Sequence, residues 1–271
     1  GIRAGTGAFN DDGVDTCYII NNKIGGITNN QGFTGIYVAG QKKGFVEISN
    51  SVVGNSTTGM SGIYCTGYYY LSQINTRNKI SNNLIENALG GSIGISVEKG
   101  QPQILNNVVR NLAGGGISVT SATAGSLVSG NTIHTLVGSG IGINGGEGVT
   151  ISKNFVHSLQ INANYASYNA LVGIAVYSVG CRVQNNLIRI GLDTAGKSNS
   201  PNTSIFGIEA YLYNTTIINN SVFIGGTGTA GSSALKIHGS IAYPGKVLNN
   251  IFVNTRNTQN VYGSIPDKYG H

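Results

Sequence analysis

The chain has little charge and few of the bulkiest or most rigid side chains. Among 271 residues there are no Trp, one Met and four Pro, and charged residues make up only 10%. No window keeps the apolar period of a helix, and no apolar run approaches the roughly 20 residues that a membrane-spanning helix needs. The sequence therefore predicts neither a helical bundle nor a membrane span.

Cysteine is also scarce, and its pattern argues against a disulfide framework. Cys17, Cys65 and Cys181 form no CxxC motif, and their number is odd. Each lies in phase with inward-facing residues of the repeats described below. We therefore expect three buried free thiols that act as small apolar side chains, and no metal site.

Glycine, in contrast, accounts for 42 residues, and a pair of asparagines recurs between short aliphatic runs, as in QILNNVVRNLAGGGISV at 103–119. Aligned on the second position of the pair, eight of nine repeats have asparagine. The aligned residues are Asn22, Ser51, Asn83, Asn107, Asn131, Asn154, Asn186, Asn220 and Asn250. A second column, spelled GIYV, GISV or similar, alternates with the first. Such self-similarity, at a period of about two dozen residues with insertions, indicates a solenoid.

Within each repeat, apolar residues recur at the two-residue period of a strand buried on one face. Short strands in a fixed order, separated by Gly, Asn and Ser, indicate a parallel solenoid in which each strand pairs with its copy one coil away. A sharp corner between strands needs a left-handed residue, which asparagine tolerates better than other side chains except glycine. We therefore predict an all-β chain of about nine coils, with the aligned asparagines hydrogen-bonded into a ladder.

These repeats resemble those of the right-handed parallel β-helix proteins, a group that includes the pectate lyases, over residues 17 to 262. The resemblance implies one β-helix domain over 1–271, with poorly patterned ends at 1–16 and 263–271. The Gly- and Asn-rich coils are also similar to β-helix segments of secreted bacterial surface proteins, which implies a secreted or cell-surface location. Because neither end has an obvious capping helix, we expect further coils or domains of a longer chain.

The outward face of the GI-x-V strands is the expected site, because the resemblance places the substrate groove of β-helix lyases there. Insertions at 160–170 and 192–204 fall in consecutive coils beside this face. Tyrosines can stack on sugar rings, and neutral polar groups can hydrogen-bond to them. The candidate carbohydrate-binding residues are Tyr165, Tyr168, Tyr177, Glu209 and Tyr211. The alternative, equally supported, is that these tyrosines only cover loops and glycine-rich strands.

Another outward row lies three residues after the asparagine column, in five consecutive coils. The row is Glu86, Arg110, His134, His157 and Arg189. Its four basic members could form a strip for an anionic polysaccharide, its two histidines could hold a metal with a third ligand, or the row could be a solvated ladder of long side chains. The net charge of +6 is spread along the chain without a run, so nucleic acid is not an expected partner.

Catalytic patterns are missing among the ten acidic residues. A β-helix lyase needs carboxylates that hold calcium beside a base, and a β-helix hydrolase needs paired carboxylates. Here the acidic residues are dispersed. Only Asp11, Asp12 and Asp15 cluster, in the poorly patterned first coil, where they favour a bound cation or a solvated turn. Calcium is therefore the only cofactor that the sequence suggests, and no catalytic residue is assigned.

The sequence thus favours a non-catalytic, adhesin-like or stalk-like segment of a secreted or cell-surface protein that binds polysaccharide or a cell-surface glycan. The alternative is a polysaccharide lyase or glycoside hydrolase that acts on an acidic polysaccharide. Convergence of Glu209 and Asp193 with Lys236 or Lys197 on the GI-x-V face would favour the enzyme.

Overall fold

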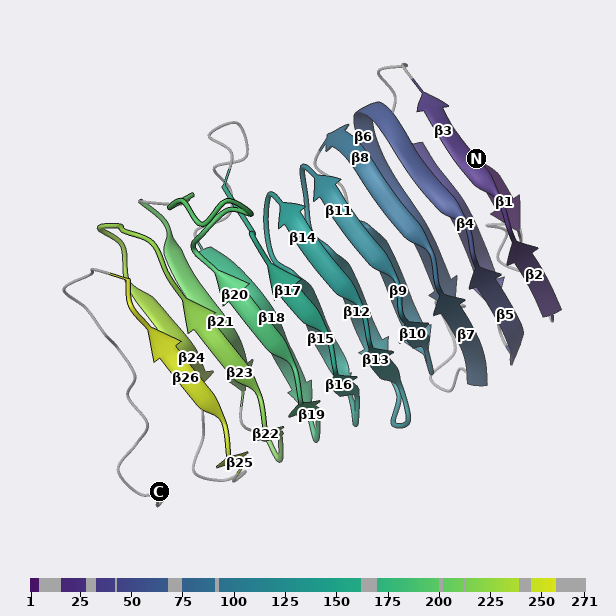
Figure 1. The fold of residues 1–271 in the computed structure, drawn as a ribbon. Helices are drawn as coiled ribbons and strands as arrows, with labels where there is room; N and C mark the ends of the chain where they lie inside the picture. The colour runs from purple at the N-terminus through teal and green to yellow at the C-terminus, as the bar shows by residue number, and fades with distance from the viewer. Residues whose placement is uncertain are drawn as a thin grey trace.

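The computed structural model folds the chain into a stack of parallel coils that follow one another in chain order (Figure 1). The structure describes residues 1–4, 16–27, 33–41, 43–67, 75–90, 93–161, 170–199, 202–211, 213–238 and 245–256. In these segments every strand pairs only in parallel, and there is no helix. The predicted all-β parallel β-helix with about nine coils is confirmed.

Three sheets of nine strands each, here named A, B and C, run along the stack. Sheet A contains β1 (Ile2–Ala4), β4 (Phe33–Gln41), the end of β6 (Val52–Gly67), β9 (Ile95–Gly100), β12 (Ile117–Ala122), β15 (Ile141–Glu147), β18 (Ala170–Val179), β21 (Ser204–Tyr211) and β24 (Ser232–His238). Sheet B contains β2 (Thr16–Ile20), β5 (Lys43–Ser49), β7 (Asn75–Ser81), β10 (Gln103–Leu105), β13 (Leu127–Ser129), β16 (Thr150–Ser152), β19 (Arg182–Gln184), β22 (Thr216–Ile218) and β25 (Lys246–Leu248). Sheet C contains β3 (Lys23–Ile27), the start of β6, β8 (Leu84–Gly90), β11 (Val108–Leu112), β14 (Thr132–Leu136), β17 (Phe155–His157), β20 (Leu187–Ile190), β23 (Ser221–Ile224) and β26 (Ile251–Asn254).

The core is a set of aliphatic columns, because each inward residue lies in register with its copy one coil away. Ile117, for example, pairs with Ile95 on one side and Ile141 on the other, and all three are buried. The glycine before each of these isoleucines keeps the strand close to its neighbours. A Cβ on Gly173 would lie 2.5 Å from the Gly207 carbonyl oxygen and 2.7 Å from a methyl carbon of a core side chain. The GI-x-V spelling therefore reflects a close approach that only glycine permits.

The two asparagines of each pair have different roles at the corner between sheets B and C. The first adopts the left-handed conformation, with φ of 55° at Asn106, for example. The full left-handed column is Asn21, Asn50, Asn82, Asn106, Gly130, Lys153, Asn185, Asn219 and Asn249. The prediction assigned both the turn and the ladder to one corner asparagine. The structure divides them, which explains why Gly130 and Lys153 interrupt only the first column.

The second asparagine of each pair forms the predicted ladder. The backbone N–H and the side-chain amide of Asn107 both donate to Asn131 Oδ1, at 2.9 and 3.0 Å, and the same amide donates to the Ile80 carbonyl at 2.9 Å. This arrangement repeats, buried or partly buried, from Asn83 to Asn250. Asn22 joins the ladder through Ser51, whose hydroxyl accepts from the Asn22 N–H at 3.1 Å. At about 1 kcal/mol net per bond, the ladder contributes substantially to a thin core.

A second, shorter asparagine ladder lies where sheet C turns toward sheet A. Asn55, Asn87 and Asn111 are left-handed. The Asn87 amide donates to Asn55 at 3.1 Å and the Asn111 amide donates to Asn87 at 3.0 Å, in each case to the preceding coil. Donation therefore runs opposite to that in the main ladder. Thr135 and Ser158 take the same left-handed position in the next two coils. The recurring asparagine five residues after the first one of the pair was the missed signal.

Residues near the N-terminus form a strand that their sequence pattern did not predict. Ile2–Ala4 pairs with β4 as the first strand of sheet A, although 1–16 was described as poorly patterned; the other poorly patterned end, 263–271, lies outside the described residues.

Cys65 and Cys181 are buried free thiols as expected, and burial raises the pKa of Cys65 to about 12. Cys17 is also free but only half-buried, because it lies in the first strand of sheet B and has a neighbour on one side only. Within the described segments there is no helix of the length and apolarity needed to cross a membrane.

Candidate functional site

The outward face of sheet A brings together four side chains near the carboxylate of Glu209, and we call these five residues the Glu209 cluster. Its members are Tyr177 of β18, Glu209 and Tyr211 of β21, and Lys236 and His238 of β24. Glu209 pairs in register with Lys236, and Tyr211 pairs with His238. Because side chains alternate across a strand, residues two apart on these strands share the outward face.

The Glu209 carboxylate is nearly enclosed and accepts three hydrogen bonds. The Tyr177 hydroxyl donates to Oε2 at 2.8 Å, while Lys236 Nζ and His238 Nε2 each lie 2.8 Å from Oε1. Only 9% of the glutamate side chain is exposed. Since an ionised carboxylate can only accept, His238 carries a proton on Nε2.

Electrostatics keep this carboxylate ionised at neutral pH. Burial alone would raise the pKa of Glu209, but hydrogen bonds from Lys236, His238 and Tyr177 outweigh burial and hold the pKa below its usual value. Conversely, burial and then the hydrogen bond to Glu209 raise the pKa of Tyr177 well above its usual value. The tyrosine therefore remains a neutral donor, and the carboxylate is charged and saturated with donors.

Aromatic rings surround the cluster. Tyr211 meets Tyr177 edge-on, with ring centroids 5.4 Å apart, and stacks nearly parallel to Tyr213 at 5.6 Å. The Lys236 ammonium lies 4.1 Å from the centroid of the Phe206 ring. We call Tyr177, Tyr211 and Tyr213 the C-terminal platform. Tyr177 has 37% of its surface exposed, so part of this aromatic side chain is accessible to a ligand.

The predicted site residues are thus brought together in part. Tyr177 contacts both Glu209 and Tyr211, whereas Tyr165 and Tyr168 lie outside the described residues. Tyr213 was missed because it follows the strand and belongs to no repeated column. Convergence of Asp193 and a lysine on Glu209 would have favoured an enzyme. Lys236 does contact Glu209, but the Asp193 carboxylate instead accepts a hydrogen bond from the Lys197 N–H at 2.8 Å, within its own turn.

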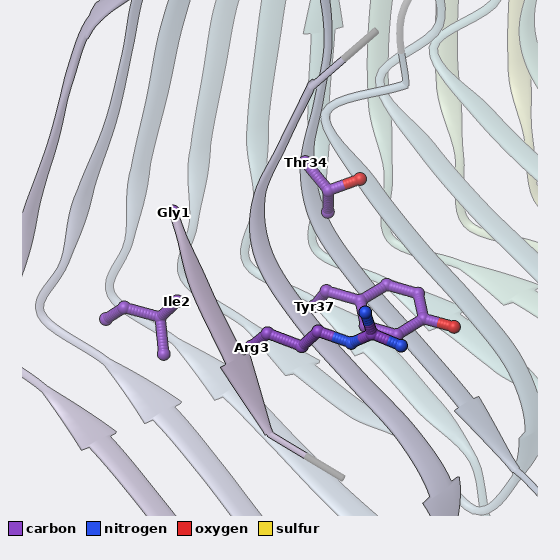
Figure 2. Close-up of a pocket in the computed structure, with 5 residues that line it drawn as sticks. All are labelled: Gly1, Ile2, Arg3, Thr34 and Tyr37. Atoms are coloured by element: carbon purple, nitrogen blue, oxygen red, sulfur yellow. The ribbon is translucent and has the colours of Figure 1, made fainter. Parts of the chain in front are cut away.

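A second aromatic group lies on the same face near the start of the chain, and we call Arg3, Tyr37 and Tyr64 the N-terminal platform. Tyr37 and Tyr64 stack with centroids 5.4 Å apart and 20° between their planes. Figure 2 shows the Arg3 side chain lying along the Tyr37 ring, with its guanidinium carbon 5.4 Å from the centroid. A shallow depression lined by Gly1, Ile2, Arg3, Thr34 and Tyr37 adjoins this stack.

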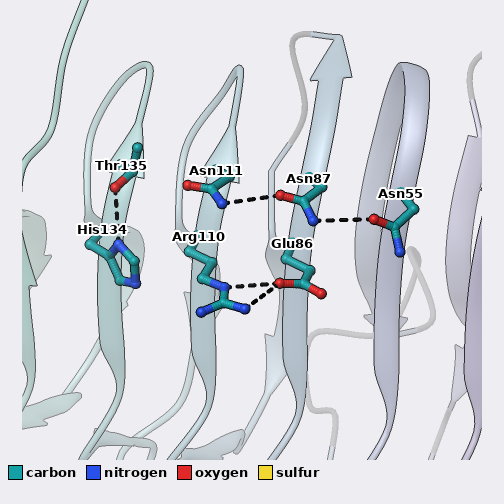
Figure 3. A network of polar contacts seen from close by, with 7 residues as sticks. All are labelled: Asn55, Glu86, Asn87, Arg110, Asn111, His134 and Thr135. Carbon is teal, nitrogen blue, oxygen red and sulfur yellow. Dashed lines mark hydrogen bonds and ion pairs between the residues drawn. The ribbon is translucent and has the colours of Figure 1, made fainter.

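The predicted basic row occupies sheet C in the expected register (Figure 3). Arg110 donates twice to one oxygen of Glu86, at 2.9 and 2.6 Å. The rings of His134 and His157 are stacked with centroids 4.7 Å apart, and their Nδ1 atoms lie 3.0 and 3.1 Å from the hydroxyls of Thr135 and Ser158.

This row carries less charge than its composition suggests. Burial, then the charge of Arg110, lowers the pKa of His134. Burial, then His134 and Arg189, lowers the pKa of His157 to about 4. Both imidazoles are therefore neutral at pH 7, and the Arg110 charge is compensated by Glu86. In the described part of the chain, no three His, Cys, Asp or Glu side chains are grouped so that they could hold a metal ion.

Comparison with known proteins supports the fold and leaves the activity open. The family model for the right-handed β-helix region matches residues 8–188. No curated protein and no solved structure was found to match the chain. Since the family model covers about two thirds of the sequence, the chain belongs to the right-handed β-helix family.

Proposed function

We propose that this chain is a non-catalytic, polysaccharide-binding β-helix segment of a secreted or cell-surface protein, with an adhesin-like or stalk-like role. The observation that carries the proposal is the Glu209 cluster, in which a saturated carboxylate fixes Tyr177 beside further aromatic rings. Rigid aromatic rings with polar tips bind sugars by stacking and hydrogen bonding, and they lose little entropy when they do so.

The state of Glu209 supports binding over hydrolysis. A general acid in a glycoside hydrolase needs a raised pKa so that it holds a proton near neutral pH. Glu209 has a lowered pKa, and both of its oxygens already accept hydrogen bonds. The carboxylate therefore suits a structural role that positions Tyr177, Lys236 and His238.

The architecture supports a load-bearing or presenting role. Continuous core columns and the buried asparagine ladder make a stiff rod, since each coil is hydrogen-bonded to the next along all three sheets. Such a rod can hold a binding face at a distance from a surface. Secretion and attachment to a cell surface belong to this proposal.

A polysaccharide lyase or glycoside hydrolase is the second candidate, and one contact favours it. His238 Nε2 bonds to the Glu209 carboxylate, and a carboxylate that orients an imidazole is the arrangement that activates a histidine base in many enzymes. Lys236 on the same oxygen adds a cation that could hold an acidic sugar.

The test is a binding and depolymerisation screen with the purified chain. Polygalacturonate, alginate, xylan and β-glucan are incubated with the protein, with and without calcium, and both retained polymer and newly formed unsaturated or reducing ends are measured. We expect retention without new ends, and we expect Tyr211→Ala to reduce it. Tyr18→Ala is the matched control, because Tyr18 is 62% exposed on sheet B, away from the proposed face. New ends that disappear in His238→Gln would establish the enzyme instead. Absence of retention on all four polymers would overturn the binding proposal.

A further inference from the structure

Sheet C carries a row of apolar side chains on its outward face, one residue after the ladder column, and we call it the apolar row. Its apolar members are Val52, Leu84, Val108, Phe155, Leu187 and Ile251. Leu187 and Ile251 are 48% and 63% exposed. The left-handed asparagines border the row on one side and the basic row borders it on the other. An exposed apolar strip with polar borders is typical of a protein–protein interface.

We propose that sheet C is the interface of a homodimer, in which a second copy of the chain packs face to face on it with its stack running in the opposite direction. The two-fold axis lies along β14, the middle strand of the nine in sheet C. Such an axis places each outward row opposite the same row of the partner, in reversed order. Leu84, two coils before β14, therefore faces the partner's Leu187, two coils after it.

The charges of the basic row match under this axis. Each Glu86 faces the partner's Arg189, because these residues lie two coils before and two coils after His134. Arg110 donates only to Oε2 of Glu86, which leaves Oε1 for a second cation. Among the described residues, Arg189 lies in no ion pair of its own chain. Arg110 faces the partner's His157 without repulsion, because the lowered pKa of His157 keeps that imidazole neutral at pH 7.

The sizes of the facing side chains match as well. Phe223, three coils after β14, faces the partner's Gly54, three coils before it, so the bulkiest residue of this part of the row lies opposite a glycine. At the ends of the face, Lys23 lies opposite the partner's Ile251, where a long side chain can reach solvent with its ammonium group. A face that complements its own reversed copy in charge and in size is what an isologous dimer requires.

Sedimentation velocity of the full chain over a concentration series tests the dimer. The two outward rows form a narrow strip at the small end of interface sizes, so we expect a dissociation constant on the order of 10 µM. Leu187→Glu places a charge opposite the partner's Leu84 and should weaken the dimer at least about tenfold. Val179→Glu is the matched control and should leave the dimer intact, because Val179 is 44% exposed at the end of β18 in sheet A. The melting temperature of each variant verifies folding.

Charge reversal tests the two-fold axis itself. In its own dimer, Arg189→Glu places two carboxylates opposite each other, and Glu86→Arg does the same with two guanidinium groups. Each variant alone should therefore stay monomeric at concentrations where the parent chain dimerises. An equimolar mixture of the two should form a heterodimer, because each facing pair again joins an acid to a base.

Three outcomes would overturn the dimer. They are a parent chain that stays monomeric up to about 200 µM, which would leave the apolar row to another partner, a mass that grows beyond the dimer, and a dimer that Leu187→Glu does not weaken. A mixture of the reversed variants that stays monomeric would overturn the antiparallel arrangement. The dimer leaves sheet A free in both copies, so these outcomes are independent of whether sheet A binds polysaccharide.

Discussion

Each platform of sheet A places a tyrosine beside a glutamate of the following coil, but the two glutamates differ in burial and in their hydrogen bonds. In the N-terminal platform, Tyr64 bonds to Glu98. Glu209 is nearly buried and accepts from Tyr177, Lys236 and His238. Glu98 is half-buried, and the Thr66 hydroxyl that donates to it lies at 3.4 Å. The charged contacts around Glu209 are shorter and stronger than a long hydroxyl bond. The C-terminal platform is therefore fixed before any ligand arrives, whereas the N-terminal platform retains more freedom.

The pKa values of Tyr64 and Tyr177 differ in the same sense. Burial, then the hydrogen bond to Glu98, raises the pKa of Tyr64 to about 12. The same two causes raise the pKa of Tyr177 further, beyond the usual range for tyrosine. Because a preorganised site loses less entropy on binding, we expect the C-terminal platform to dominate affinity.

The largest effect is expected in the main asparagine ladder, which runs along the stack at the corner between sheets B and C. Asn131→Leu removes the oxygen that accepts from the Asn107 N–H and amide, and it takes the donor from the Ile104 carbonyl. Leaving such buried groups unpaired should lower the free energy of unfolding by about 3 kcal/mol or more. Chemical denaturation measures this loss. Thr120→Ala, an outward change in the preceding sheet A strand β12, is the control and should cost under about 0.5 kcal/mol. Equal losses for the two variants would contradict the ladder's role.

The next effect tests the contrast between the two carboxylates directly. Glu209→Ala leaves Lys236 and His238 without their shared acceptor. Because both side chains are about one-third exposed and can be rehydrated, we expect a loss of about 2 kcal/mol, below that of a fully buried pair. Glu98→Ala should cost under about 0.5 kcal/mol. Denaturation curves of the two variants under the same conditions give the difference. Similar losses would show that the platforms are equally rigid.

The fold was largely predictable because the same pattern of strand and corner residues recurs in nearly every coil. Asn107, Asn131 and Asn154 recur for one physical reason, a buried amide at a corner, so the column could be found without any structure. Separating the two asparagines of the pair was harder, since both turn and ladder favour the same residue. Only Gly130, whose residue type favours the left-handed conformation, indicated which one is left-handed.

The candidate site was predictable only in part, because it depends on contacts that occur once. Alternation placed Tyr177, Glu209 and Tyr211 on one face, but it could not show that one carboxylate would collect three donors. Residue counts also misjudged the row on sheet C. Two histidines and two arginines indicate positive charge, yet burial keeps both imidazoles neutral at pH 7 and an ion pair with Glu86 compensates Arg110.

A smaller loss of stability is expected when a single tyrosine hydroxyl is removed from either platform. Tyr177→Phe removes a 2.8 Å bond to a charged acceptor that keeps its other donors, so we expect a loss of about 1 kcal/mol. Tyr64→Phe, at the more exposed Glu98, should cost about half as much. Thermal unfolding followed by far-UV circular dichroism compares the two variants with the parent chain. A greater loss in Tyr64→Phe than in Tyr177→Phe would reverse the order of rigidity assigned to the platforms.

The smallest expected effect is a difference in the pH range over which His157 of sheet C and Glu209 lose their contributions to stability. His157 has a lowered pKa, so the folded state takes up its proton less readily than the unfolded state does. Its contribution to stability is therefore intact above pH 6.5 and is lost as the pH falls from 6.5 toward 4. Glu209, whose pKa is also lowered, retains its contribution above pH 4.5 and loses it only as the pH falls further. The half-buried ring should be worth roughly 0.5–1 kcal/mol after solvent screening. His157→Gln should thus be relatively more stable than the parent chain at pH 5 than at pH 8, and Thr120→Ala should show no such change. Denaturation at the two pH values measures this difference. A parent chain that loses nothing relative to His157→Gln between pH 8 and pH 5 would mean that His157 is protonated as easily in the fold as outside it.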